Sequence, residues 1–295
     1  SAHAKLSAAR AGRSRQRLDD KVLTDWNGLM IAAMARGYQV LDEPKYLHAA
    51  QMAAAFILKE LRDADGNLLH RWREGHAAKR ALLDDYAFLI HGLIDLHQSD
   101  FDPKWFEWAV QLQSLQDGMF WDEKAGAYFF DDARDSTLIL RSKEFEDMAV
   151  PSGNSISALN LLRMADLTYD ESYRRRADRI IRASAGLMLQ SPSACPQMLI
   201  AADYAFDRSK EIAIVGNPND SKTIELLKTL RAAFLPNKVV AVSDGKTSPP
   251  KPASPAGKIA IKGTPTAYVC AKGACRLPTT DPSELPTLME LKKRG

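Results

Sequence analysis

Apolar residues recur at helical spacing from residue 20 to about residue 206, and the breaks between them contain Gly, Pro and Asp. The clearest example is the stretch 82–96, whose apolar side chains fill two adjacent helix faces. One of these faces consists of Leu83, Ala87, Ile90 and Ile94. Because so apolar a helix must be covered on most sides, the pattern predicts a mainly helical region with several interior helices.

Polar clusters open three of the apolar helices, at 19–27, 84–86 and 151–155. Their spacing of roughly 65 residues corresponds to one long helical hairpin per repeat. A more amphipathic and more charged stretch follows each apolar helix, at 45–61, 104–115 and 169–189. We therefore expect inner and outer helices in alternation, with a fourth inner helix at 195–206 and about seven helices in all. Short strand-like hairpins at 65–73 and 118–130 interrupt the pattern.

The pattern changes after residue 210. A buried strand at 211–216, an amphipathic helix at 223–234 and a second strand at 238–242 predict a βαβ-like unit. A proline-rich loop at 243–258, a strand at 266–270 and a closing helix at 282–291 complete it. We predict two domains, a helical-hairpin region at 1–209 and a small α/β region at 210–295.

Composition excludes several classes of protein. The 295 residues carry 40 Lys and Arg against 37 Asp and Glu, a net charge of +3, which does not indicate a nucleic-acid-binding surface. No run of 18 apolar residues occurs, and the first ten residues lack the apolar core of a secretory signal. We expect a cytoplasmic protein that binds neither nucleic acid nor membrane.

Two cysteines and one glycine-containing loop resemble known ligand-binding motifs, but each matches its motif incompletely. Cys270 and Cys275 are close enough for a small disulfide, but the odd total of three cysteines favours reduced thiols. Too few ligands surround them for structural zinc, and we expect no metal and no cofactor. The loop 216–223 resembles a phosphate-binding loop, but Ser221 replaces the second glycine, and we interpret Asp220 or Ser221 as a helix N-cap.

Four motifs, at 19–30, 83–87, 151–155 and 267–270, resemble the C-terminal portion of the spermatogenesis-associated protein 20 family of thioredoxin-domain proteins. The resemblance implies a mainly α fold, a partial (α/α)6 toroid like that of six-hairpin glycosidases, with a small C-terminal α/β appendage. It implies an enzyme similar to an N-acylglucosamine 2-epimerase or a glycosidase, and an N-terminal thioredoxin-like domain that this chain lacks.

A closed toroid needs about twelve helices, so about seven leave one flank of the layer without a neighbour. We expect the N-terminal thioredoxin-like and toroid portion, or a second copy of the chain, to cover that flank.

Inner helices of a toroid converge on a central cleft, so the polar clusters that open them are the candidate site. The carboxylates and the histidine that are candidates for catalysis are Asp84, Asp85, Glu144 and His91. The residues that are candidates for binding a sugar ligand are Trp26, Asn27, Tyr86, Lys143, Asp147, Ser152 and Asn154.

Two functions remain open. In the first, the toroid binds, isomerises or hydrolyses a sugar. Hydrolysis needs paired carboxyl groups, and epimerisation prefers a histidine such as His91. In the second, the chain is a non-catalytic scaffold that docks a thioredoxin-like module, and the same polar side chains cap helices.

Overall fold

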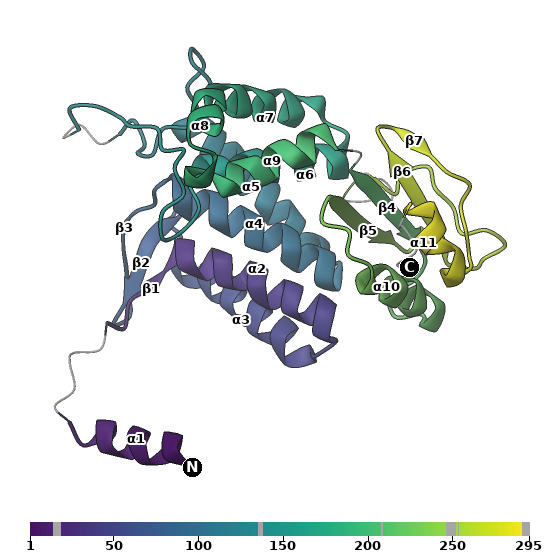
Figure 1. The fold of residues 1–295 in the computed structure, drawn as a ribbon, viewed down its shortest axis with the longest axis horizontal. Helices are drawn as coiled ribbons and strands as arrows, with labels where there is room; N and C mark the ends of the chain where they lie inside the picture. Colours follow the sequence, from purple (N-terminus) through teal and green to yellow (C-terminus); the bar gives the residue numbers. More distant parts are fainter. Residues whose placement is uncertain (14–18, 135–137, 208, 246–251, 253, 291–295) are drawn as a thin grey trace.

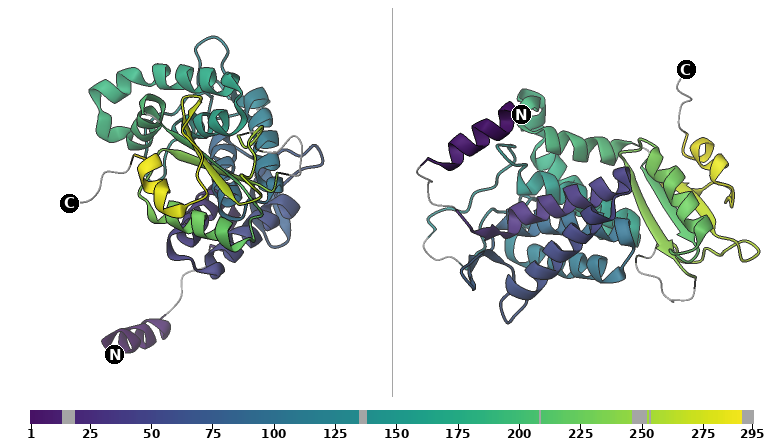
Figure 2. Two further views of the ribbon diagram at one scale, coloured as in Figure 1. Left: turned by 90° about the vertical axis from the view of Figure 1, so that its right-hand side faces the viewer. Right: turned by 90° about the horizontal axis from the view of Figure 1, so that it is seen from below.

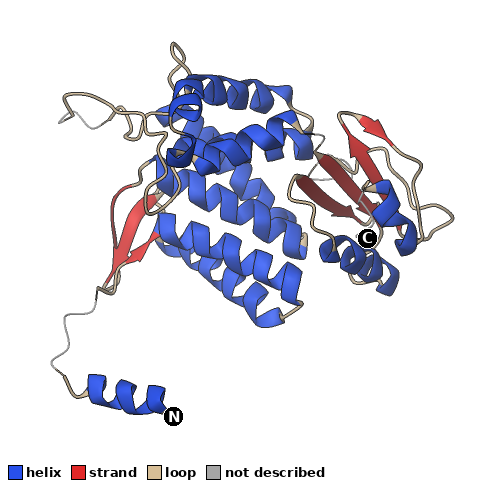
Figure 3. Ribbon diagram, in the orientation of Figure 1, coloured by secondary structure: helices blue, strands red, loops and turns tan. Residues whose placement is uncertain are grey.

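A computed structural model describes residues 1–13, 19–134, 138–207, 209–245, 252 and 254–290 (Figure 1). Helices fill one side of the molecule, and a four-stranded sheet with its own helices lies on the other (Figure 3). The change from helix to sheet comes at Lys210. The division into two domains at this point stays a prediction.

The helical side is a layer of hairpins. The inner helices α2 (Thr24–Leu41), α4 (Leu83–Asp100), α6 (Gly153–Thr168) and α9 (Pro196–Phe206) contact one another in that order. The outer helices α3 (Pro44–Glu60), α5 (Pro103–Phe120) and α7 (Glu171–Ala183) each pack against the inner helix that precedes them. Helix α8 (Ala185–Gln190) and the 3-10 turn Pro192–Ala194 lead into α9.

Each turn from an inner to an outer helix follows the same local rule. The inner helices α2, α4 and α6 end at Asp42, Phe101 and Tyr169, all in the left-handed conformation that terminates a helix. The next helix begins within three residues, at a proline in α3 and α5. These short turns hold the two helices of each hairpin side by side.

Helices α2 and α4 approach closely where Gly28 and Gly92 face each other. A Cβ atom on Gly28 would lie 2.5 Å from the Leu89 backbone nitrogen, and one on Gly92 would lie 2.5 Å from the Gly28 carbonyl oxygen. Backbone therefore contacts backbone at this crossing. The buried faces of both helices join one apolar core that runs through α6 and α9.

A small antiparallel sheet lies at the N-terminal ends of the inner helices. Its strands are β1 (Val22–Leu23), β2 (Leu69–Arg73) and β3 (His76–Arg80), in the order β1-β2-β3. Strand β1 runs directly into α2, and the Thr24 hydroxyl donates to the Leu69 carbonyl at 2.6 Å. This sheet fixes where α2 begins.

The second sheet has the order β5-β4-β6-β7. Strands β4 (Lys210–Val215) and β5 (Lys238–Ser243) are parallel and joined by α10 (Ser221–Ala232). Strands β6 (Thr266–Ala271) and β7 (Ala274–Cys275) are antiparallel additions, and the 3-10 turn Pro282–Glu284 and α11 (Leu285–Leu288) follow. The sheet lies against the helical layer (Figure 2), where the Gln98 side chain accepts from the Val240 N–H at 2.7 Å.

Several predictions of local structure are wrong. Cys270 and Cys275 form a disulfide, because the β6–β7 register makes them cross-strand partners. Helix α5 continues to Phe120, so only an isolated bridge between Trp121 and Tyr128 remains of the predicted hairpin. Ser184 divides the predicted helix at 169–189 into α7 and α8, so the described part of residues 24–206 has eight α-helices.

Other terminal features also differ from the prediction. The closing helix is short, and its predicted end at residue 291 lies outside the described residues, as does much of the loop at 243–258. An unpredicted helix, α1 (Ala2–Ala11), buries none of its residues. Within the described residues, no helix is both long enough and apolar enough to span a membrane.

The glycine contact gives a stability prediction. Replacing Gly92 by Ala should lower the free energy of unfolding by about 1–3 kcal/mol, because the new methyl group displaces the α2 backbone. Gly37→Ala is the matched control, since Gly37 is also inside a helix, and a Cβ there meets Tyr46 of α3 at an ordinary 3.7 Å. Urea unfolding followed by circular dichroism measures both. Equal stability of the two variants would contradict the close backbone contact.

Candidate active site at the N-terminal ends of the inner helices

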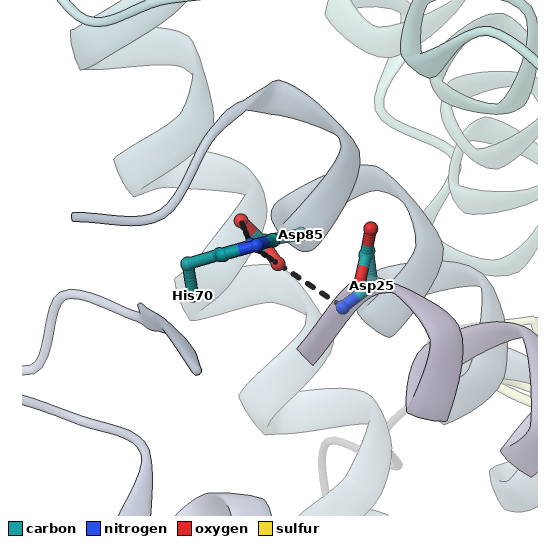
Figure 4. A group of neighbouring side chains, drawn as sticks. All are labelled: Asp25, His70 and Asp85. Carbon is teal, nitrogen blue, oxygen red and sulfur yellow. Dashed lines mark hydrogen bonds and ion pairs between the residues drawn. The ribbon is translucent and has the colours of Figure 1, made fainter. Parts of the chain in front are cut away.

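Asp85 joins three segments at the start of α4. Its carboxylate accepts from the Asp25 N–H at 3.0 Å and from the Leu82 N–H at 2.8 Å. The His70 Nδ1 lies 3.0 Å from both carboxylate oxygens (Figure 4). Asp85 is buried, and its contact with the His70 side chain raises the pKa of that imidazole. The carboxylate thus ties β2 and the N-terminus of α2 to α4.

Two other carboxylates make equivalent contacts to neighbouring helices. Asp84 accepts from the Gly153 N–H, at the first residue of α6, and a Cβ on Gly153 would lie only 2.4 Å from Asp84 Oδ1. Asp147 accepts from the Ser152 N–H at 2.9 Å and from the Gln197 N–H at 2.7 Å, so it links α6 to α9. Free N–H groups at helix N-termini favour such acceptors.

The pKa of Asp84 is strongly raised. Burial, together with the nearby carboxylates of Glu144, Asp85 and Asp25, raises its pKa to about 7. The Gly153 N–H opposes this shift. Asp25 is partly buried as well, and burial raises its pKa. Asp84 is therefore a carboxyl group that holds a proton near neutral pH.

Exposed groups lie on the first turns of α2 and in the segment before α6. The Trp26 indole on the first turn of α2 is 60% exposed, and Met30 one turn later is 53% exposed. Glu144 is exposed too. A flat apolar ring next to carboxyl groups is suited to a ligand with both apolar faces and hydroxyl groups.

Five of the predicted site residues form bonds within the fold. The Tyr86 hydroxyl is in the core and accepts from the Leu68 N–H at 2.9 Å. Lys143 Nζ donates to Asp122 at 2.6 Å, and Asn27 Nδ2 donates to the Leu23 carbonyl at 2.7 Å. The remaining two are Ser152, which is the N-cap of α6, and Asn154, which is buried and bonds to the backbone of Tyr128 and Glu144.

His91 does not join Asp84 at the site. It lies two turns further along α4, where its Nδ1 is 3.1 Å from Asn160 Oδ1. Burial lowers the pKa of this imidazole to about 4, so His91 is neutral at physiological pH. Its nearest ionisable neighbours are Asp95 and Arg163.

The sequence prediction missed the role of Asp25 and His70. Within the described residues these two and Asp85 form a group whose possible metal-ligand atoms all lie within 4.8 Å of one another. Both oxygens of Asp85 already accept hydrogen bonds, which fits a hydrogen-bonded histidine–aspartate pair better than a metal site. His70 and Asp85 lie 15 residues apart on different elements, so the sequence contains no motif that predicts their pairing.

Solved structures share the arrangement of helices. A family 76 α-mannanase from Bacteroides thetaiotaomicron matches with a TM-score of 0.54 at 15% identity, over 75% of this chain and 58% of the mannanase chain. Cellobiose 2-epimerase from Bacillus thermoamylovorans matches with a TM-score of 0.51 at 13% identity, over 88% and 67% of the two chains. The chain therefore has the predicted fold, a mainly α partial (α/α)6 toroid with a small α/β appendage.

Curated proteins share sequence with nearly the whole chain. Spermatogenesis-associated protein 20 from Rattus norvegicus is 34% identical over 298 residues, and the human protein is 34% identical over 302. The alignments cover 97% of this chain but only 38% of each relative. No family model matches the chain. The chain is similar to spermatogenesis-associated protein 20 over nearly its whole length and spans about two fifths of the length of these relatives.

The raised pKa of Asp84 predicts a pH-dependent effect on stability. Above pH 4 the unfolded chain ionises this carboxyl group, whereas the folded chain retains the proton up to about pH 7. The folded state is therefore penalised as pH rises through this window. Asp84→Asn should raise the free energy of unfolding at pH 8 by up to about 4 kcal/mol and have little effect at pH 4.

Urea unfolding at the two pH values measures this difference. Asp178→Asn, at an exposed position on α7, is the control and should show no such pH dependence. A gain for Asp84→Asn that is the same at pH 4 and pH 8 would contradict the raised pKa.

Proposed function

We propose that the N-terminal ends of the inner helices form a carbohydrate-binding site in which Asp84 acts as a proton donor. The observation that supports this most strongly is a partly buried carboxyl group with a pKa of about 7 beside the exposed carboxylate of Glu144. The exposed Trp26 offers the flat apolar surface on which sugar rings stack. The fold neighbours named for mannanase and cellobiose 2-epimerase activity make a sugar the first substrate class to test.

The chemistry follows from two carboxyl groups with different ionisation. In hydrolysis, protonated Asp84 gives its proton to the glycosidic oxygen as the bond from that oxygen to the anomeric carbon breaks. A second carboxylate, Glu144 or Asp25, activates the water that adds to the anomeric carbon, or attacks that carbon itself. In epimerisation, one carboxylate removes the proton beside the carbonyl carbon of the open-chain sugar, and a protonated group returns a proton to the opposite face.

Turnover of defined disaccharides tests the proposal. The chain is incubated with an α-linked mannobiose and with cellobiose, and proton NMR follows monosaccharide release and the appearance of a C2 epimer. Because the proton donor is lost, Asp84→Asn should lower the rate by about 10²–10⁴-fold. Trp26→Ala should raise KM more than it lowers kcat.

Asp178→Asn is again the matched control and should retain the full rate. An Asp84→Asn variant as active as the unmodified chain would exclude the proposed proton donor. Absence of turnover and of binding for both sugars would count against a carbohydrate site.

A second candidate is a non-catalytic scaffold. Asp85, Asp147, Ser152 and Asn154 all bond to backbone groups, as helix caps and tethers do. Exposed apolar side chains on α2 and α9, such as Met30 and Ile200, would then contact a partner. That partner would be a thioredoxin-like and toroid portion, as the sequence resemblance implies, or a second copy of the chain. Light scattering distinguishes a complex from a 32.7 kDa monomer, which would contradict self-association.

A cytoplasmic location stays a prediction. Fractionation of cells that express the tagged chain tests it, and recovery of the chain in a membrane or secreted fraction would contradict it.

A further inference from the structure

A cavity of about 540 Å³ lies between the inner helices and the α/β unit. Its walls come from all four inner helices, and the segment that joins α10 to β5 closes one side. Apolar side chains such as Leu159 and Ile200 form part of the wall. A volume of this size accommodates a small organic molecule.

Positive charge exceeds negative charge on this wall. Four cationic residues line the cavity: Arg36, Arg163, Arg231 and Lys238. Asp95 is the one acidic residue among the described lining residues. Its two carboxylate oxygens are already used, one by the Arg163 guanidinium and the other by Arg36 Nε at 3.0 Å. The surplus of cations therefore has no carboxylate counterpart in the described wall.

Arg163 is the most deeply placed of these cations. Only 2% of the residue is exposed, and its Nε atom is buried without a hydrogen-bond partner. Its Nη1 atom lies 3.4 Å from Nδ1 of His91, which is neutral at physiological pH and supplies no charge. An arginine buried with incomplete pairing is costly, and a bound anion would offset that cost.

Arg36 and Lys238 lie nearer the opening. Arg36 is 43% exposed at its side chain and uses Nε for Asp95, which leaves its two terminal nitrogens directed elsewhere. Lys238 donates to the Leu235 carbonyl at 2.8 Å. Burial and the charge of Arg36 lower the pKa of this lysine to about 8. An anion in the cavity would relieve the repulsion among these groups.

We propose that this cavity binds a small organic anion through a carboxylate or phosphate group held by Arg36, Arg163 and Lys238, with the rest of the ligand against the apolar wall. Guanidinium groups present paired N–H donors that match both anions. The proposal is independent of the proposed carbohydrate site. Asp95 lies eleven residues beyond Asp84 on α4, which corresponds to about 16 Å along the helix.

Isothermal titration calorimetry tests the proposal with three probes of similar size. Glucuronate supplies a carboxylate, glucose 6-phosphate supplies a phosphate, and glucose is the neutral control. We expect at least one of the anions to bind and glucose to bind at least tenfold more weakly. The stronger anion identifies which of the two groups the cavity prefers. Failure of both anions to bind at millimolar concentration would overturn the proposal.

Substitutions test whether the ligand lies in this cavity. Arg36→Gln should weaken anion binding at least tenfold, and it leaves Asp95 paired with Arg163. Arg175→Gln removes the same charge from an exposed position on α7 and should leave affinity unchanged. Lys238→Gln is a second variant in the wall, and circular dichroism verifies folding of all three. Equal affinity in Arg36→Gln, Lys238→Gln and Arg175→Gln would overturn the assignment.

The pH dependence of glucuronate binding gives a separate readout. The titratable and charged groups that face Lys238 come from every surrounding element: Arg36, His91, Asp95, Arg163, Tyr204 and Arg231. Arginines stay protonated, burial raises the pKa of Tyr204 well above its usual value, and His91 titrates near 4. Affinity should therefore fall between pH 7 and pH 9 as Lys238 loses its proton. The Lys238→Gln variant should lack this fall, and an identical fall in that variant would contradict the role of Lys238.

Discussion

The free N–H groups at the start of the inner helices are the constraint on which this end of the molecule depends. Four inner helices begin close together, and their first turns cannot satisfy their own N–H groups. Asp84, Asp85 and Asp147 supply acceptors to α6, α2 and α9, so each carboxylate joins one helix to the next. The same bonds that align the helices also gather acidic side chains in one place. Asp84 consequently has a raised pKa, because it is largely buried and its neighbours are carboxylates too.

The two ends of the helical layer differ in charge, and the helix dipoles are consistent with this difference. Carboxylates occupy the N-terminal ends, where the dipole is positive. Arg36 and Arg163 lie in the C-terminal halves of α2 and α6, where cations are favoured. The buried Asp95 holds both arginines and lets them approach each other across α4. An acidic site and a basic cavity thus lie at different levels of the same four helices.

Much of the fold could be predicted because its signals are local. Apolar periodicity indicated α4 and α6, which are buried on nearly every face, and the strand runs at β4 and β5 were recognisable from β-branched residues. Asp220 caps α10, as the loop sequence indicated. The disulfide between Cys270 and Cys275 was missed, because it depends on a strand register that cysteine counting does not reveal.

The site was harder to predict because its contacts join distant segments. The polar clusters correctly marked the helix starts. Some of their side chains are accessible to a ligand, and others form bonds within the fold. Asn154 and Tyr86 have the residue types of a sugar site, yet each is buried against backbone. The pairing of His70 with Asp85, and that of Arg36 and Arg163 with Asp95, needs the three-dimensional packing of separate helices and strands.

The central claim is that a saccharide binds at the N-terminal ends of the inner helices. A crystal structure of the chain with a bound manno-oligosaccharide tests it most directly. We expect a sugar ring stacked on the Trp26 indole, with a glycosidic or hydroxyl oxygen within hydrogen-bond distance of the Asp84 carboxyl group. A saccharide bound elsewhere, with Trp26 and Asp84 free of contacts to it, would contradict the account.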